Sequence, residues 1–369
     1  MKESVQLPMG VKKVKLEIKQ LYQKSLKLKA EEKVDSLEKL LVICEDTAEH
    51  SYGYLTRFEL IKEYKQLNKI YSAIKLYLAN VHVFLEYRFN SKPLLNSYSW
   101  VAKHIDSVFN IKQKEITDFF THMKNVYEIS GYSLRSYYQE YYNYLMRVGR
   151  WEEGFATYSR WMVESRDESS QSIGQEESDR AFYYFNVGDY DNGKYVFEAV
   201  KKGTDCPLGT RTYAYPRAVK YYFELKDWEM TTYLMQRGYE YAKGKSSAIE
   251  EVAEIMKSLT ILNPKIALKL WEKHRCSFKN SENKRAKHSF GISSYLLEKS
   301  LGTHLAGSQK LKKLEQNAQE MYEIQEYMDQ RNGTDAYHEE LMYWEEIWGN
   351  YNKRRKHKKL QQINPDDER

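Results

Sequence analysis

Apolar residues recur every three or four positions along most of the chain, which is the period of one face of a helix. The pattern is clear over residues 52–90, 97–129 and 308–331, and residues 11–45 fit one or two further helices. Only 6 of the 369 residues are proline and 17 are glycine, too few turn-forming residues for a β-rich chain. The pattern predicts an almost entirely helical protein.

A short phrase repeats between residues 149 and 271. A glycine or polar residue is followed by an aromatic residue two positions later, a small residue after five and a bulky residue after nine; the fourth copy is looser. The copies are Gly149, Trp151, Gly154 and Tyr158; Gly188, Tyr190, Gly193 and Phe197; Lys226, Trp228, Thr231 and Met235; Leu262, Pro264, Ala267 and Trp271. A period of 36 to 39 residues is typical of an array whose units stack because none buries its own apolar face.

The phrase has a physical interpretation. A turn at its first position ends one helix, and the next helix uses its small residue to approach the preceding helix closely. The bulky residue four positions later lies on the same helix face. Each of the first three copies is preceded by a run of apolar and aromatic residues with helical spacing. Before the first copy these are Tyr138, Tyr141, Tyr142 and Leu145. The repeating unit is therefore predicted to be an antiparallel helix pair.

These residues resemble the tetratricopeptide repeats. "VGDYDNGKYVFEAV" at 187–200 and "VGRWEEGFATYSRWM" at 148–162 are most similar to the turn and second helix of that family, and "LNKIYSAIKLYLAN" at 67–80 is a weaker match. The repeats here are a few residues longer than the family's commonest length and lack its proline after the second helix. The resemblance implies an all-α fold, a right-handed α-solenoid of antiparallel helix pairs with helical caps at both ends.

We predict four regions from these patterns. A solenoid grows by adding layers, so the length does not require separate cores. The regions are an N-terminal helical region with degenerate helix pairs (1–130), the repeat core (131–277), a C-terminal helical cap (278–352) and a basic tail expected to be disordered (353–369). The acidic, serine-rich stretch 165–179 is predicted to be an exposed, mobile loop. Trp344 and Trp348 are expected to cover the open end of the array; the alternative is an exposed patch for dimer or partner contact.

The net charge of +6 comes from the C-terminal tail. The chain has 58 basic and 52 acidic residues, and the tail cluster of Lys353, Arg354, Arg355, Lys356, Lys358 and Lys359 accounts for the excess. Such a cluster binds nucleic acid, an anionic surface or an acidic partner through charge; the alternative is a solvated terminus.

Catalytic and metal-binding motifs are absent from the sequence. It contains no phosphate-binding glycine loop, no H-E-x-x-H, no G-x-S-x-G and no C-x-x-C. The nine histidines are scattered, and Cys44, Cys206 and Cys276 lie too far apart to suggest a pairing. We therefore expect no catalytic residue, no metal, no cofactor and a protein that is not an enzyme.

The resemblance places a binding groove along the first helix of each pair, a surface suited to a peptide or a partner helix. Asn143 falls where family members hold a peptide backbone or carboxylate. The implied groove residues are Gln139, Asn143, Arg147, Phe182, Asn186, Lys220 and Glu224.

The sequence therefore favours a non-enzymatic scaffold or adaptor that binds a protein or peptide in the groove. The alternatives are a peptide-responsive regulator, an immunity-type inhibitor that clasps its partner, and nucleic-acid binding through the tail. With no apolar run near 20 residues and no signal peptide, we expect a cytoplasmic protein without membrane insertion. Homo-oligomers are compatible with the sequence.

Overall fold

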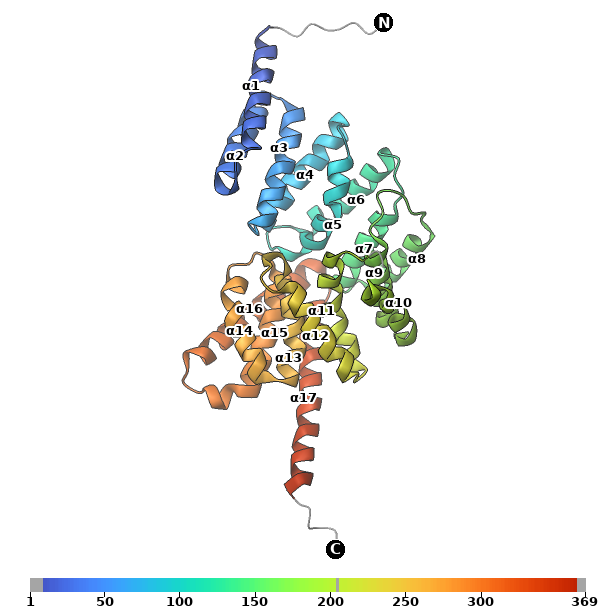
Figure 1. Cartoon of the computed structure of the whole chain (residues 1–369), viewed down its shortest axis with the longest axis vertical. Coiled ribbons are helices and arrows are strands. Elements are labelled where there is room, and N and C mark those ends of the chain that lie inside the picture. Colours follow the sequence, from blue (N-terminus) through green and yellow to red (C-terminus); the bar gives the residue numbers. More distant parts are fainter. Residues whose placement is uncertain (1–8, 204–205, 364–369) are drawn as a thin grey trace. The chain divides into compact units, whose positions relative to one another are not determined.

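In a computed structural model, the backbone is described for residues 9–203 and 206–363, and the side chains for residues 14–203 and 206–353. These residues form seventeen α-helices and no strand (Figure 1). The all-α class expected from the sequence is thereby confirmed, and the neighbouring helices pack in succession as in a helical solenoid.

The chain divides into two compact units. Unit 1 comprises residues up to Tyr137 with Ser165–Ser169, and unit 2 comprises Tyr138–Glu164 with the chain from Ser170 onward. The helices of unit 1 are α1 (Met9–Ser25), α2 (Ala30–Asp46), α3 (His50–Gln66), α4 (Ile70–Tyr87), α5 (Lys92–His104) and α6 (Gln113–Ile129). Helix α7 (Arg135–Arg147) crosses the boundary, and unit 2 continues with α8 (Trp151–Val163), α9 (Ile173–Asn186), α10 (Tyr190–Lys202), α11 (Leu208–Glu224), α12 (Trp228–Ala242), α13 (Ile249–Leu262), α14 (Pro264–Lys279), α15 (Lys284–Leu301), α16 (Gln309–Asn332) and α17 (Ala336–Ile363).

Tyrosine rings form much of the core of unit 1. Tyr77 and Tyr98 are fully buried and pack against the ring of Phe119. The Tyr77 hydroxyl donates to the carbonyl oxygen of Leu94 at 2.9 Å, so the ring is buried without leaving its polar atom unpaired. The tyrosine content of the chain is thus partly explained by helix packing.

In unit 2 the repeated phrase lies at the turn inside each helix pair. Gly149 and Gly188 have φ of +76° and +80°, and Lys226 has a φ of +58°. This left-handed conformation ends the first helix of the pair and favours glycine. The fourth copy turns differently, because Asn263 alone separates α13 from α14 and Pro264 occupies the first helical turn.

The small residue of each phrase permits close helix contact, as predicted. A Cβ atom on Gly193 would lie 2.5 Å from the ring of Phe185, and one on Gly154 would lie 2.6 Å from the sulfur of Met146. The bulky residues at the ninth position are all buried: Tyr158, Phe197, Met235 and Trp271. The aromatic residues two positions after the start of the phrase are less buried, since Trp151 and Trp228 remain 42% and 44% exposed.

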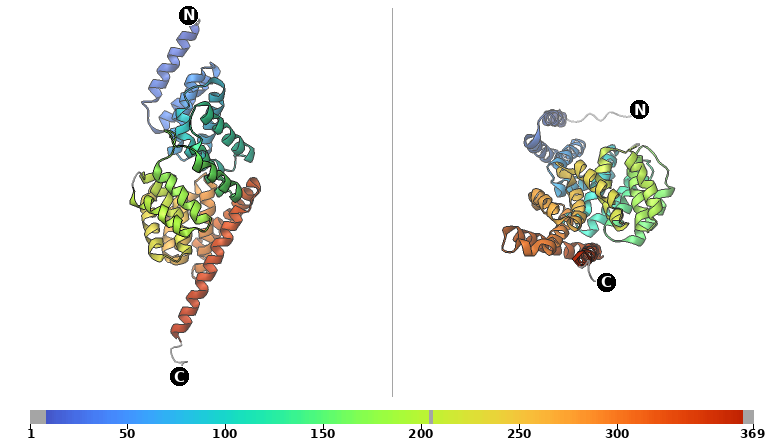
Figure 2. Two further views of the ribbon diagram at one scale, coloured as in Figure 1. Left: turned by 90° about the vertical axis from the view of Figure 1, so that its right-hand side faces the viewer. Right: turned by 60° about the horizontal axis from the view of Figure 1, so that its bottom comes forward.

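Helix α17 is the main feature that the repeat pattern does not predict. It contacts α13, α15 and α16, and Leu341 and Trp344 share a core cluster with Phe223 of α11 and Ile292 of α15. Figure 2 shows it in red as one uninterrupted helix. Because α11, α13 and α15 are first helices of successive pairs, α17 occupies part of the face predicted as a groove, here called the first-helix face.

The acidic loop prediction is wrong at its C-terminal end. Helix α9 begins at Ile173, where the Ser172 hydroxyl accepts a hydrogen bond from the Gln175 amide, and Asp179 is fully buried. The remaining loop is bound to unit 1, since the Asp167 carboxylate accepts from the Ser133 amide at 2.6 Å. A local excess of acidic residues therefore does not mark a mobile segment here.

The two C-terminal tryptophans are packed against neighbouring helices, which excludes the alternative of an exposed patch. Trp344 is 1% exposed, and the indole nitrogen of Trp348 donates to the Ser300 hydroxyl at 2.8 Å, so the pair does not form an exposed patch. Helix α17 extends to Ile363, and the disorder expected for residues 353–369 stays a prediction. Of the basic cluster, Lys353 is exposed; the side chains from Arg354 onward and all of residues 364–369 lie outside the described part of the structure.

Candidate functional site

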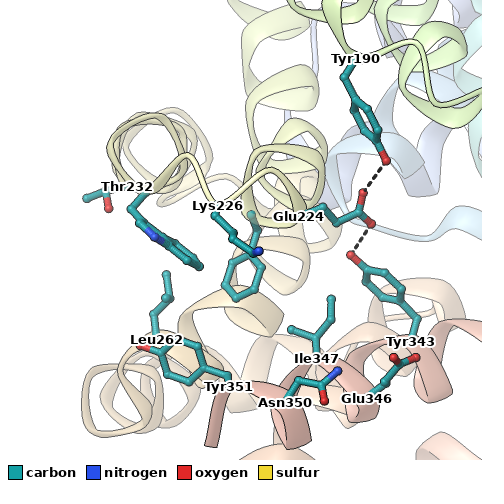
Figure 3. A pocket seen from close by; sticks show the side chains of 12 residues that line it. Tyr190, Glu224, Lys226, Thr232, Leu262, Tyr343, Glu346, Ile347, Asn350 and Tyr351 are labelled. Atoms are coloured by element: carbon teal, nitrogen blue, oxygen red, sulfur yellow. Dashed lines mark hydrogen bonds between the residues drawn. The ribbon is translucent and has the colours of Figure 1, made fainter. Parts of the chain in front are cut away.

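A cavity of about 1010 Å³ opens on unit 2 between the α11–α12 turn and one side of α17. Figure 3 shows the side chains that face it. They belong to five helices, α10 to α13 and α17, and to the turn between α11 and α12. The lining residues are Tyr190, Phe223, Glu224, Lys226, Trp228, Thr232, Leu262, Tyr343, Glu346, Ile347, Asn350 and Tyr351.

The carboxylate of Glu224 is held between two tyrosines. The Tyr343 hydroxyl donates to one oxygen of Glu224, and the Tyr190 hydroxyl donates to the other over a longer distance of 3.5 Å. The two phenols approach the carboxylate from opposite sides in Figure 3. Burial raises the pKa of Tyr343, and the hydrogen bond to Glu224 raises it further. Tyr343 therefore stays protonated and keeps Glu224 in place as an acceptor.

Aromatic rings form much of the remaining wall. Trp228 is 44% exposed and packs edge-on against the buried ring of Phe223, with centroids 5.4 Å apart. Tyr190 and Trp228 are both second-position aromatics of the repeated phrase. The phrase thus provides an aromatic residue at the start of α10 and of α12, and the stacking of the pairs brings both to one cavity.

The opposite wall is a single stripe of α17. Tyr343, Ile347, Asn350 and Tyr351 recur at intervals of three and four residues, with Glu346 beside them, so one helix face carries them all. The charged groups of the lining are Glu224, Glu346 and Lys226. Glu346 and Lys226 are exposed, whereas Glu224 is half-buried.

The predicted groove residues on α7 and α9 surround a buried carboxylate. The side-chain amides of Gln139 and Asn143 donate to one oxygen of Asp179, at 2.7 and 2.9 Å. The guanidinium of Arg217, on α11, lies 3.9 Å from the other oxygen and 4.3 Å from the centre of the Phe182 ring. Burial raises the pKa of Asp179, and Arg217 and the amides offset this effect only in part.

The predicted residues on α11 lie beside α17. The ammonium of Lys220 lies 4.2 Å from the centre of the Tyr343 ring, and burial lowers its pKa. Glu224 accepts from Tyr343, as described above. Asn186 accepts a hydrogen bond from the Tyr221 hydroxyl at 2.7 Å, and Arg147 is half-buried. Of the seven predicted residues, Gln139, Asn143 and Phe182 belong to the Asp179 cluster, and Lys220 and Glu224 contact α17. Asn186 and Arg147 belong to neither group, and only Glu224 lines the cavity.

A group of charged side chains fixes α17 further along the first-helix face. Lys257 of α13 is 1% exposed and pairs with Glu340 of α17 and, at 2.8 Å, with Glu254. His288 of α15 lies 3.4 Å from Glu340. Burial disfavours the charged form of Glu340, but Lys257 and His288 outweigh it and hold the pKa of Glu340 below its ordinary value.

Sequence reasoning missed Asp179, Arg217, Trp228 and Tyr343. A signal existed for the first two, because the positions nine residues before the start of the first three phrases are Glu140, Asp179 and Arg217. All three carry charge on helices that pack against neighbours. Tyr343 and the stripe around it had no such signal, since α17 lies outside the repeat pattern.

No protein-family model matches the chain, and no curated protein sequence matches it. Among the described helices, none is long and apolar enough to cross a membrane. Within the same part of the chain, no group of three or more histidine, cysteine or acidic side chains is arranged to hold a metal ion. Cys44 is buried, Cys206 is half-buried and Cys276 is exposed, all three as free thiols.

Proposed function

We propose that the protein is a non-enzymatic scaffold that binds a protein or peptide partner through the first-helix face of unit 2, with the cavity beside α17 as its recognition site. The observation that carries this proposal is the cavity itself. Its aromatic walls and half-buried carboxylate are what a recognition pocket needs: apolar surface for affinity and a few fixed polar groups for orientation.

The position of α17 supports the same proposal. The first helices of the pairs accept a helix against them through apolar contacts, at Trp344 and Phe223, and through ion pairs, at Lys257 and Glu340. This is the manner in which an amphipathic helix lies on a groove. A partner segment that enters the cavity extends a surface that already accommodates one helix.

The test is affinity capture from cells that express the chain natively, with wild type, Trp228→Ala and Trp151→Ala as baits. Trp151 and Trp228 hold the same position in the repeated phrase and have nearly equal exposure, but Trp151 lies outside the cavity. A partner retained by wild type and Trp151→Ala but lost by Trp228→Ala supports the proposal. Equal capture by all three baits contradicts it.

Substitutions of the groove residues predicted from the sequence would be less informative than Trp228→Ala. Asn143→Ala would leave Asp179 with one donor fewer in a buried site, and Lys220→Glu would place a second carboxylate near Glu224. Either substitution would lower stability and binding together. Trp228 is exposed enough to be replaced without opening a core.

A further inference from the structure

We propose that the cavity beside α17 takes the cationic side chain of an arginine or lysine of the partner. This inference rests on the proposed function and specifies the chemistry of its recognition site. It follows from one cavity lining that combines a fixed carboxylate, Glu224, the partly exposed side chain of Trp228 and a second carboxylate, Glu346.

Glu224 is arranged as an acceptor for an incoming donor. Two tyrosine hydroxyls fix its position, yet a carboxylate offers about four lone-pair sites. Lys220, one helical turn earlier on α11, lies against the ring of Tyr343, and no ion pair joins it to Glu224 among the described side chains. Lys220 and Glu224 still attract each other electrostatically, and the two tyrosine hydrogen bonds leave the carboxylate further acceptor sites.

The aromatic residues favour the same ligand. A guanidinium or ammonium group is attracted to the faces of tryptophan and tyrosine rings, and the guanidinium also stacks on them. Trp228, Tyr190 and Tyr351 contribute such rings to the lining that also holds the carboxylates. The aliphatic stem of an arginine or lysine would contact Ile347 and Leu262, because long basic side chains bury their methylene groups and keep their charged ends in polar surroundings.

Other ligand classes fit less well. An anion would meet Glu224 and Glu346, with Lys226 as the one opposing charge of the lining. A purely apolar group would remove water from Glu224 without replacing its hydrogen bonds, which is unfavourable. The lining carries one net negative charge, so charge complementarity selects the cation.

The experiment uses the full chain labelled with 5-fluorotryptophan, with the Trp228 resonance assigned from a Trp228→Phe variant. The probes are four capped pentapeptides, acetyl-Gly-Gly-X-Gly-Gly-amide, in which X is arginine, lysine, norleucine or glutamate, followed by spermidine. We expect the arginine and lysine peptides to shift the Trp228 resonance saturably, and the norleucine and glutamate peptides to leave it unchanged.

Variants locate the charge that is recognised. Glu346→Gln is expected to weaken binding of the arginine peptide about threefold, and Glu224→Gln about tenfold, as for loss of one charge-assisted hydrogen bond. Glu346→Lys, a change at an exposed residue, should abolish binding without altering the fold. Glu229→Gln removes an exposed carboxylate of α12 outside the cavity and should bind like wild type.

Three results would overturn the proposal: no response of Trp228 to the arginine and lysine peptides, equal binding of the norleucine or glutamate peptide, and tighter binding of spermidine than of either basic peptide. The last would assign the cavity to a small polyamine. Failure of the cation proposal can be distinguished from failure of the proposed function. If partner capture depends on Trp228 but the basic peptides do not shift its resonance, the scaffold function is supported and the proposed cationic ligand is contradicted.

Discussion

Asp179 of α9 and Glu340 of α17 are two carboxylates that are stabilised in different ways. Asp179 is fully buried and receives neutral amide donors, with its guanidinium neighbour 3.9 Å away. Glu340 is half-buried and directly pairs with the ammonium of Lys257. Consequently the pKa of Asp179 is raised and that of Glu340 is lowered. The Asp179 cluster joins helices that are neighbours in the repeat, whereas the Glu340 cluster attaches a helix from outside it.

The largest expected effect comes from removing the buried ammonium. Lys257→Met leaves Glu254 and Glu340 without the ammonium that they share, and we expect it to lower the free energy of unfolding by about 3 kcal/mol. Urea unfolding at neutral pH measures the loss. Arg217→Met is the matched change at Asp179 and should cost about 1–2 kcal/mol, since Asp179 keeps its amide donors. Equal losses would contradict the distinction between the two clusters.

The anchoring of α17 should depend on pH through Glu340. Its pKa lies below the ordinary value of 4.5 in the folded protein, so the folded state binds fewer protons than the unfolded state near that pH. The stability from this group is complete above pH 4.5 and is lost as pH falls through the folded pKa. Hydrogen exchange of α17 amides at falling pH should show accelerated opening in wild type and a flatter profile in Glu340→Gln.

Asp179 should show the opposite pH dependence. Burial raises its pKa above the ordinary 3.8, so the folded state binds more protons, and stability declines as pH rises from 3.8 through the folded pKa. The difference in unfolding free energy between wild type and Asp179→Asn should therefore shift in favour of the variant as pH rises. Paired urea titrations across this range test the sign, and a shift toward wild type would show that Arg217 outweighs burial.

The smallest expected effect concerns the end of the α17 contact. Ser300→Ala removes the acceptor of the Trp348 indole and should cost about 1 kcal/mol. Thermal unfolding detects a change of this size. Ser159→Ala, which removes an exposed intrahelical hydroxyl in the repeat, is the control and should be nearly neutral.

The repeat phrase predicted the helix pairs well because its positions are constrained by local physics. Gly149 and Gly188 are required by a positive φ, and Gly154 and Gly193 by helix contact. The loop at 165–179 was misjudged because Asp179 looks solvated in sequence. Its burial depends on partners about one repeat away, among them Gln139, Asn143 and Arg217.

The candidate site was mostly beyond sequence reasoning for a different reason. Glu224 was predicted from the repeat register, but Tyr343, Glu346 and Tyr351 reach it from a helix with no counterpart in the repeats. The spacing of a helical repeat does not predict which surface a later helix will pack against. Trp228 was recognised as part of the phrase, yet its exposure becomes visible only once the pairs are stacked.

The attachment of α17 gives unit 2 an order of assembly. Its contacts join residues separated by 83 and 119 positions: Lys257 to Glu340, and Glu224 to Tyr343. Because contacts between stacked pairs close shorter loops, we expect them to form before these contacts. During synthesis, the helix pairs emerge from the ribosome before α17 exists. The part of the first-helix face that α17 occupies is therefore open in the nascent chain until α17 has emerged and packed against it.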